Sequence, residues 1–276
     1  MPSLFDVASH FDDVICTDAY SGATLFAGQF SSFIESSPDG STTQKRTLSL
    51  APGISLPARK TISYQGEYWI IGDGNVDMIY NTPTRKAYWM KKSFGLFTRY
   101  TPLQALNGSA GVAAHASLKY LKDTVNGVSD NAYDPQWSLN LAQGETANKG
   151  DIIKQGSTYY RVRVSYVDGS GFLLAVCDQL DDGSFVSVTK TSTGGYDPIT
   201  DTYTSASTTV NALMMEPYKL YTYFTEADPR FTAGDKSLLT AAALAVGSTL
   251  TIASEPWKVQ SSYPELDAWA SHIRRV

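Results

Sequence analysis

The sequence has few charged residues and no excess of positive charge. Charged side chains make up 18% of the 276 residues, and 22 lysines and arginines are outnumbered by 27 aspartates and glutamates, for a net charge of −5. A typical soluble domain has about 25% charged residues. A protein that coats nucleic acid needs a basic footprint, so this balance excludes a general nucleic-acid coat and leaves only local basic patches open.

Long apolar runs and clustered cysteines are also missing. No apolar stretch approaches the roughly 18 residues needed to cross a bilayer, so we expect no membrane partner. The start, MPSLFDVASHFDDVIC, does not show basic residues followed by an apolar block, so we expect no signal peptide. The two cysteines, Cys16 and Cys177, lie far apart, and we expect both to be reduced and partly buried.

The motifs of common enzymes and metal sites are absent. The chain has no Cys-x-x-Cys, no His-Glu-x-x-His, no Gly-x-Ser-x-Gly and no Gly-x-x-x-x-Gly-Lys phosphate loop. Of the three histidines, we interpret His10 as structural and expect His272, close to Arg274 and Arg275, to face solvent or a partner. We therefore predict that the protein is not an enzyme and has no catalytic residues, no metal site and no cofactor.

Strand-forming and turn-forming residues dominate the chain instead. It has 17 tyrosines and 21 glycines and is rich in Thr and Val, a composition that favours strands and turns over helices. Short apolar runs separated by turn signals about every 8–12 residues are typical of a small sandwich or barrel. We predict a mainly β protein with two or more small β-barrel or sandwich units.

Two segments have helical spacing. In residues 4–15, LFDVASHFDDVI, apolar side chains recur at i, i+3, i+4 and i+7 after Ser3, a residue type that caps helices. This pattern predicts a short N-terminal helix. Residues 110–122, AGVAAHASLKYLK, are a second helix candidate.

One short pattern occurs three times. ISYQGEYWII, IIKQGSTYYRV and LTIASEPWKV each have an apolar run, a tight polar turn, an aromatic residue and a second apolar run. The pattern is typical of a β-hairpin. The copies are unequally spaced, starting at residues 62, 152 and 250, which argues against a solenoid and fits one hairpin in each barrel-like unit.

A change of composition marks a boundary in the second half. Residues 181–210 are rich in Gly, Ser, Thr and Asp, and they fit either a linker or a long exposed hairpin with TGGYDPITD at its tip. We therefore divide the chain into two domains. Residues 1–180 form an N-terminal mainly β domain with two related hairpin units, and residues 181–276 form a C-terminal β-barrel domain that begins with this loop or hairpin.

Positive charges gather in two places of this acidic protein. The segment TRKAYWMKKSFGLFTRY interleaves basic and aromatic residues, and the chain ends in Arg-Arg-Val. The segment fits a strand pair with solvated lysines, and it also fits a surface for an acidic partner or passing nucleic acid. The candidate partner- or DNA-facing residues are Arg85, Lys86, Lys91, Lys92, Arg99, Arg274 and Arg275.

The C-terminal unit resembles a known family. From Phe231 to Val276 it reads FTAGDKSLLTAAALAVGSTLTIASEPWKVQSSYPELDAWASHIRRV, with Gly-Asp before an apolar run, then a glycine, an aromatic residue followed by Lys-Val, and a last strand ending in Arg-Arg. This resembles the neck proteins of tailed bacteriophages, namely the head–tail adaptor, head-closure and tail-attachment proteins, which are small β-barrels. ATLFAGQFSSF, RKTISYQGEYWIIGD and KGDIIKQGSTYYRV in the first half are similar in style.

The resemblance implies a virion structural protein, made in the host cytoplasm, that joins the portal or adaptor to the tail as a homomeric ring. The implied partners are other copies of itself, portal, adaptor or tail proteins, and passing double-stranded DNA bound without sequence specificity. The family brings no catalytic residues. The alternative is a carbohydrate-binding or tail-fibre-like β module, because Tyr133, Trp137 and Tyr196 are aromatic residues of the kind that stack on sugars.

Overall fold

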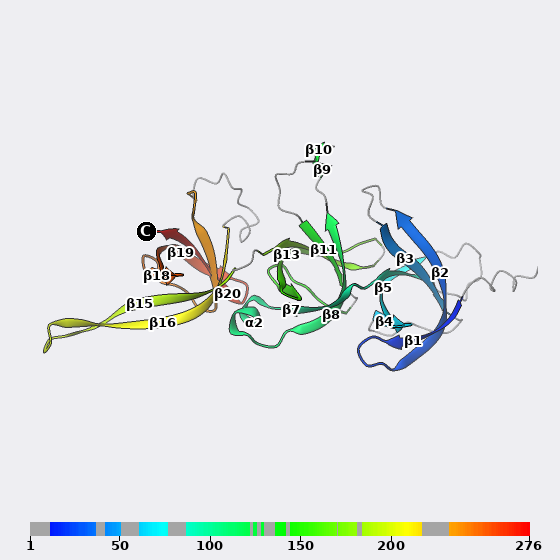
Figure 1. Cartoon of the computed structure of the whole chain (residues 1–276), viewed down its shortest axis with the longest axis horizontal. Coiled ribbons are helices and arrows are strands. Elements are labelled where there is room, and N and C mark those ends of the chain that lie inside the picture. The colour runs from blue at the N-terminus through cyan, green and yellow to red at the C-terminus, as the bar shows by residue number, and fades with distance from the viewer. Residues whose placement is uncertain are drawn as a thin grey trace, which may run out of the picture. The chain divides into compact units, whose positions relative to one another are not determined.

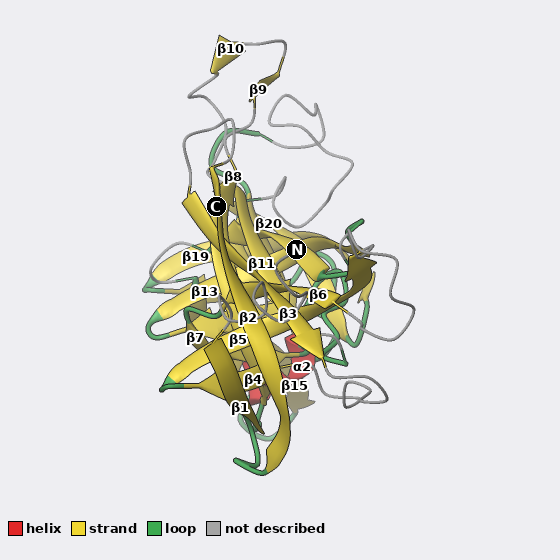
Figure 2. Ribbon diagram, turned by 90° about the vertical axis from the view of Figure 1, so that its right-hand side faces the viewer, coloured by secondary structure: helices red, strands yellow, loops and turns green. Residues whose placement is uncertain are grey.

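The fold was obtained as a computed structural model and is mainly β, as the sequence predicts (Figures 1 and 2). The structure describes residues 12–36, 42–50, 61–76, 87–121, 124–125, 128–129, 136–141, 144–169, 171–180, 184–216 and 232–276. The prediction of small barrel units is confirmed, since the strands close into six-stranded barrels.

The first barrel is built from the first six strands. They are β1 (Asp12–Asp18), β2 (Thr24–Ser36), β3 (Thr42–Leu50), β4 (Thr61–Tyr64), β5 (Glu67–Val76) and β6 (Ala87–Lys92). Their order is β1-β2-β3-β6-β5-β4, and antiparallel pairing of β1 with β4 closes the sheet. Its core holds Cys16, Leu48, Ile62, Trp69, Ile71, Tyr88 and Met90.

The last barrel is built from the last six strands. They are β15 (Phe185–Asp197), β16 (Thr202–Met215), β17 (Lys236–Thr240), β18 (Thr249–Ile252), β19 (Glu255–Glu265) and β20 (Ala268–Arg275). Their order is β15-β16-β17-β20-β19-β18, with all pairs antiparallel and β15 closing onto β18.

A third closed sheet lies between them in the sequence. It contains β7 (Gly95–Tyr100), β8 (Val112–Leu121), β11 (Gln136–Leu141), β12 (Ile152–Gln155), β13 (Thr158–Val167) and β14 (Leu173–Gln179), in the order β11-β14-β13-β12-β7-β8. A two-stranded ribbon, β9 (Thr124–Val125) and β10 (Val128–Ser129), follows β8. The six residues of α2 (Pro102–Asn107) connect β7 to β8.

All three barrels have the same topology. When the strands of each barrel are numbered one to six along the chain, their order around the sheet is 1-2-3-6-5-4 in every case. The part of the chain that the structure describes therefore contains one barrel topology three times in succession along the sequence. The expectation of two or more barrel units holds, and the repeated unit is the whole barrel.

The three copies of the repeated pattern form the hairpin of strands four and five in each barrel. Each hairpin has four paired positions around a two-residue turn. In each, an aliphatic residue lies opposite an aromatic one, and all six side chains are buried. These pairs are Ile62 with Trp69, Ile153 with Tyr160, and Leu250 with Trp257.

The turns of these hairpins have the left-handed backbone that tight hairpins require. Gln65 and Gly66 have φ of 48° and 77°, and Ala253 and Ser254 have φ of 48° and 68°. Positive φ at both central residues is the mark of a type I′ turn, whose twist matches that of the strands. In the middle barrel only the first turn residue, Gly156, has positive φ, at 58°.

The strand one to strand two connection differs in every barrel. It is the short turn of residues 19–23 in the first barrel, and it includes the helix α2 in the middle barrel. In the last barrel β15 and β16 continue well beyond the barrel and end in a turn at residues 198–201. Residues 185–215 therefore form an ordered hairpin and not a linker (Figure 1).

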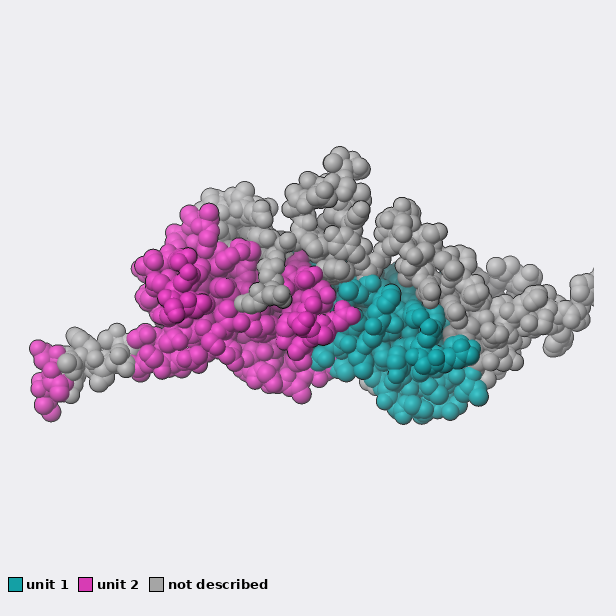
Figure 3. Space-filling view, in the orientation of Figure 1, with its two compact units in different colours: residues 1–98, 113–149, 162–177 teal, residues 99–112, 150–161, 178–276 magenta. Residues whose placement is uncertain are grey.

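The chain forms two compact units, coloured in Figure 3. The first comprises residues 1–98, 113–149 and 162–177, and it holds the first barrel. The second comprises residues 99–112, 150–161 and 178–276, and it holds the last barrel and α2. The strands of the middle barrel are divided between the two units.

The predicted N-terminal helix is wrong over the part that the structure describes. Residues 12–15 belong to β1, and residues 4–11 lie outside the described residues. Side chains of β1 alternate, with Cys16 and Asp18 buried and Ile15 67% exposed. This period of two, with pairing to β2, replaces the helical spacing. The described helix, α2, lies at residues 102–107, and none of the described helices could span a membrane.

The second predicted helix, residues 110–122, is also wrong. Residues 112–121 form β8, which pairs with β11. Four successive residues of β8, from Ala114 to Ser117, are buried, so this strand is covered on both faces. A strand covered on both faces shows no alternation, and pairing in the barrel overrides the helix propensity of its alanines.

Candidate functional site

Each predicted partner-facing residue that the structure describes lies against a carboxylate. Arg85 and Lys86 fall outside the described residues. The other five pairs are Lys91 with Asp168 at 3.5 Å, Lys92 with Glu67, Arg99 with Asp151 at 3.1 Å, Arg274 with Asp235 at 2.9 Å and Arg275 with Glu255 at 2.6 Å. Their contact with a partner stays a prediction.

These pairs differ in how much they face solvent. Lys91 is only 8% exposed, and its ammonium also lies 4.2 Å from the centre of the Phe172 ring. The Arg99 pair is likewise largely buried, because Asp151 is. Arg275 keeps 62% of its side chain exposed, so it is the most accessible cation of the five.

The end of the last barrel holds a charged cluster around Asp235. This buried carboxylate accepts hydrogen bonds from the Thr232 backbone N–H and hydroxyl, from His272 Nε2 at 2.8 Å, and from Arg274 Nε and a terminal guanidinium nitrogen at 2.9 Å. Burial alone would raise the pKa of Asp235. The hydrogen bonds from Arg274, Thr232 and His272 outweigh burial and hold this pKa well below its ordinary value.

The interpretation of His272 as solvent-facing is wrong. His272 is 7% exposed and bonded to Asp235. It lies on β20, which pairs with β17 directly after Asp235. His272 and Arg274 are two apart on one strand, so both side chains face the same side and reach the same carboxylate. The sequence alone does not indicate Asp235 as a site, although the Gly-Asp and His-Ile-Arg motifs contain three of the cluster's residues, Asp235, His272 and Arg274.

A second buried polar group lies beside the first barrel, in the first unit. His115 on β8 packs on Tyr68 with ring centres 4.3 Å apart, and against the edge of Tyr20. Its backbone N–H donates to the Tyr20 hydroxyl at 3.0 Å, and Ser93 Oγ lies 3.4 Å from its Nδ1. Burial lowers the pKa of His115, so the ring is neutral at pH 7.

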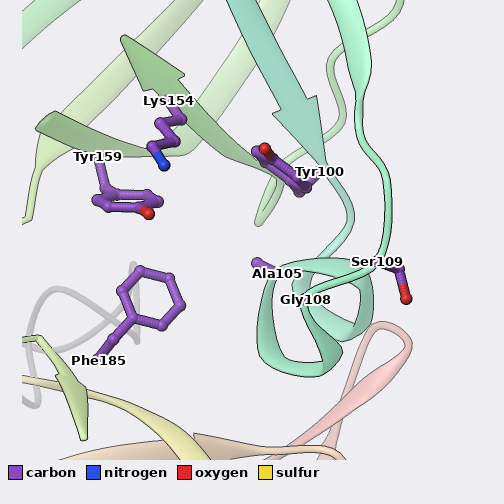
Figure 4. A pocket seen from close by; sticks show the side chains of 7 residues that line it. All are labelled: Tyr100, Ala105, Gly108, Ser109, Lys154, Tyr159 and Phe185. Carbon is purple, nitrogen blue, oxygen red and sulfur yellow. The ribbon is translucent and has the colours of Figure 1, made fainter. Parts of the chain in front are cut away.

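The second unit contains a pocket of about 210 Å³ (Figure 4). Aromatic rings of three strands and one face of α2 form its wall. Tyr159 and Phe185 lie 4.7 Å apart at an angle of 54°. The lining residues are Tyr100, Ala105, Gly108, Ser109, Lys154, Tyr159 and Phe185.

The pocket combines an apolar wall with one cation. Tyr100, Ala105, Tyr159 and Phe185 pack on a buried cluster that includes Leu106, so the wall is backed by the core. Lys154 Nζ lies 5.1 Å from the centre of the Tyr159 ring. A hydrogen bond with Tyr159 raises the pKa of Lys154, which keeps the ammonium charged at neutral pH. The sequence offered no signal for this pocket, because its residues come from segments far apart.

α2 is held in place on the last barrel. The Thr101 hydroxyl accepts a hydrogen bond from the Gln104 backbone N–H, and the Gln104 side-chain oxygen accepts one from the Thr101 backbone N–H. The Asn211 amide donates to the Leu106 carbonyl, and the Leu103 N–H donates to Asp267. Leu106 is buried in the same cluster as Leu213 and Leu239.

Other sequence-based candidates fall as follows. Within the described ranges, no three His, Cys, Asp or Glu side chains gather as a metal site would need. Cys16 and Cys177 are free, and both are fully buried where the sequence suggested partial burial. Of the three aromatic residues that suggested a sugar-binding module, Tyr133 lies outside the described residues, whereas Trp137 is in β11 and Tyr196 is in β15.

Comparison with known proteins found no match. No protein family, curated protein or solved structure matches this chain.

Proposed function

We propose that the protein is a structural component of the virion at the head–tail interface of a tailed phage, where it forms a homomeric ring between the portal or adaptor and the tail. The observation that carries the proposal is the same closed barrel, repeated three times, with the neck-protein-like sequence in the last copy. Closed barrels have no open sheet edge inside the unit, so they suit a part that must stay rigid between neighbours.

The charge arrangement supports contact with DNA that passes without being held. Each of the five described candidate cations lies against a carboxylate, and the net charge of the chain is −5. Tight non-specific binding requires cations that neutralise phosphates and release counterions. Cations already neutralised by carboxylates offer little of that, so DNA would slide past this protein.

Immuno-electron microscopy tests the location. Gold-labelled antibody against the full chain is applied to purified particles of the phage that encodes it, and a second antibody against the capsid shell is the control. We expect gold at the junction of head and tail. If gold never falls on virions while the capsid antibody labels them, the proposal is wrong.

A binding assay separates this function from its alternative. On a glycan array the full chain is expected to bind nothing, whereas a carbohydrate-binding module would retain a defined set of sugars. Native mass spectrometry of the chain with and without portal and adaptor proteins then reports whether a ring forms and on which partner.

A further inference from the structure

The hairpin of the last barrel extends beyond the barrel as an arm, which we define as residues 191–207. β15 pairs with β18 only through Val188 to Lys190, and β16 pairs with β17 only from Ala212 onward. Within the described residues, the strands of the arm pair only with each other. At its tip Ile199 is 92% exposed, the highest value among the described large apolar side chains. Single exposed apolar residues are common, but this one stands at the end of an extended element.

The equivalent connections of the other two barrels bind the barrel that follows them in the chain. In the first barrel, Tyr20 lies in the connection between strands one and two and packs on His115 of β8, a strand of the middle barrel. The Tyr20 hydroxyl also accepts a hydrogen bond from the His115 backbone N–H. In the middle barrel, α2 forms this connection and buries Leu106 against Leu213 of the last barrel. The arm is the corresponding connection of the last barrel, so by analogy with the other two it is the element expected to bind a neighbouring surface.

The arm cannot reach the pocket of its own chain. Phe185 lines the pocket at the start of β15, and the tip turn begins at Pro198, thirteen residues further along. An extended strand advances about 3.3 Å per residue, which places the tip about 40 Å from that wall. The arm of a second copy is not tied to this pocket by β15, so its tip can enter it.

The pocket suits the tip in size and charge. Its volume is about 210 Å³, and an apolar cavity of about 150 Å³ already holds a molecule of benzene. The aromatic wall offers apolar contact for a branched side chain. Lys154 at the pocket carries a positive charge, and Asp201, exposed beside Ile199 at the tip, carries a negative one.

We propose that the tip of the arm docks in the aromatic pocket of a second copy of this chain, with Ile199 against Tyr159 and Phe185 and Asp201 near Lys154. The contact joins two different surfaces, so it repeats from copy to copy and closes as a ring when the rotation allows. The inference rests on the proposed function in one respect, because it supplies the contact between copies in the homomeric ring.

Disulfide trapping between two variants tests the contact directly. The full chain with Ile199→Cys is mixed with the full chain with Ala105→Cys, which places a thiol in the pocket wall, and the mixture is oxidised. The matched control replaces Ala105→Cys by Val246→Cys, an exposed position of the same unit outside the pocket. The native thiols, Cys16 and Cys177, are buried and do not compete.

We expect the 199–105 pair to give several times more mixed disulfide dimer than the 199–246 pair. Equal yields from the two pairs, or no 199–105 dimer at the highest soluble concentration, would overturn the inference. Because each chain carries only one half of the pair, a trapped bond is necessarily between copies.

A second measurement follows self-association by sedimentation or native mass spectrometry. Ile199→Asp should weaken it by about 10- to 100-fold, since burying an Ile side chain is worth one to two powers of ten in an equilibrium constant. Ile199→Val should retain most of it. Unchanged association in Ile199→Asp would contradict the docking. Because Ile199 is exposed, both variants should keep the wild-type circular dichroism.

The outcomes distinguish this inference from the proposed function. Label at the neck without trapping would leave the function standing and remove the tip contact. Trapping without label on virions would keep the tip contact and remove the location.

Discussion

Replacing Asp235 with Asn removes one charge from the centre of the last barrel's polar cluster while keeping the size of the side chain. The carboxylate accepts bonds from both the N–H and the hydroxyl of Thr232 and from His272. These donors connect the turn before β17 to β20, so the cluster fastens two strands that are adjacent in the barrel.

The size of the effect follows from those bonds. A hydrogen bond to a charged group contributes about 1.5–3 kcal/mol, and a buried donor left without its acceptor costs a further 1–3 kcal/mol. Asn keeps one acceptor oxygen, so it retains part of the set and turns an N–H₂ toward at least one donor. We expect Asp235→Asn to lower the free energy of unfolding of the last barrel by about 2–4 kcal/mol.

Denaturant unfolding measures this loss of stability, and hydrogen exchange of peptides from β17 and β20 localises it to these two strands. The matched control is Glu255→Gln, which breaks the exposed pair with Arg275 and should change stability by less than about 1 kcal/mol. If Asp235→Asn is as stable as the control, the buried cluster does not hold the strands and the reasoning fails.

The same variant has a defined pH dependence. The folded pKa of Asp235 lies below its unfolded value, so its contribution is fully present above pH about 4 and declines as the pH falls toward the folded pKa. The stability gap between wild type and Asp235→Asn should therefore narrow between about pH 4 and pH 2. A gap that stays constant over this range would show that the charge is not responsible.

Three further perturbations have defined outcomes. Ser254 has φ of 68°, a backbone conformation that strains a residue with a side chain, so Ser254→Gly should raise the free energy of unfolding by about 0.5–1 kcal/mol and shift the denaturant midpoint upward. The control, Ser157→Gly, changes a turn position without positive φ and should give no gain in stability. Burial lowers the pKa of His115, so stability is lost as the pH falls below about 6.5, and His115→Phe should flatten the slope of unfolding free energy between pH 7 and pH 5. Burial raises the pKa of Cys16 to about 12, so mass spectrometry after iodoacetamide at pH 8 should find Cys16 unmodified in the native protein and alkylated after unfolding.

The sequence predicts the barrels well where the signal is local. The hairpin of β4 and β5, with its turn at Gln65 and Gly66, depends on four or five neighbouring residues on each side, so its position and two-residue turn can be predicted directly from the sequence. The shared topology of the three barrels is harder to predict from the sequence. The order 1-2-3-6-5-4 depends on which strands meet across the sheet, and those pairings join residues as distant as Lys45 and Lys91.

The predicted helices failed for the same reason. The alanines around His115 favour a helix locally, and only the partners of β8 make this segment a buried strand. The pocket is even harder to predict from the sequence, because Tyr100, Lys154 and Phe185 come together only after folding. The Asp235 cluster lies between these extremes, because its Gly-Asp and His-Ile-Arg motifs are visible in the sequence but only the pairing of β17 with β20 brings them together.

The barrels hold one connection constant and leave another free to change. The turn between strands four and five is two residues long in all three, while the connection between strands one and two is a short turn, a helix or an extended arm. Insertions in the latter leave closure of the sheet intact. Proteins with this topology can therefore gain a new binding partner in evolution by changes in this one connection. In protein design, a different arm can be grafted onto the last barrel without repacking its core.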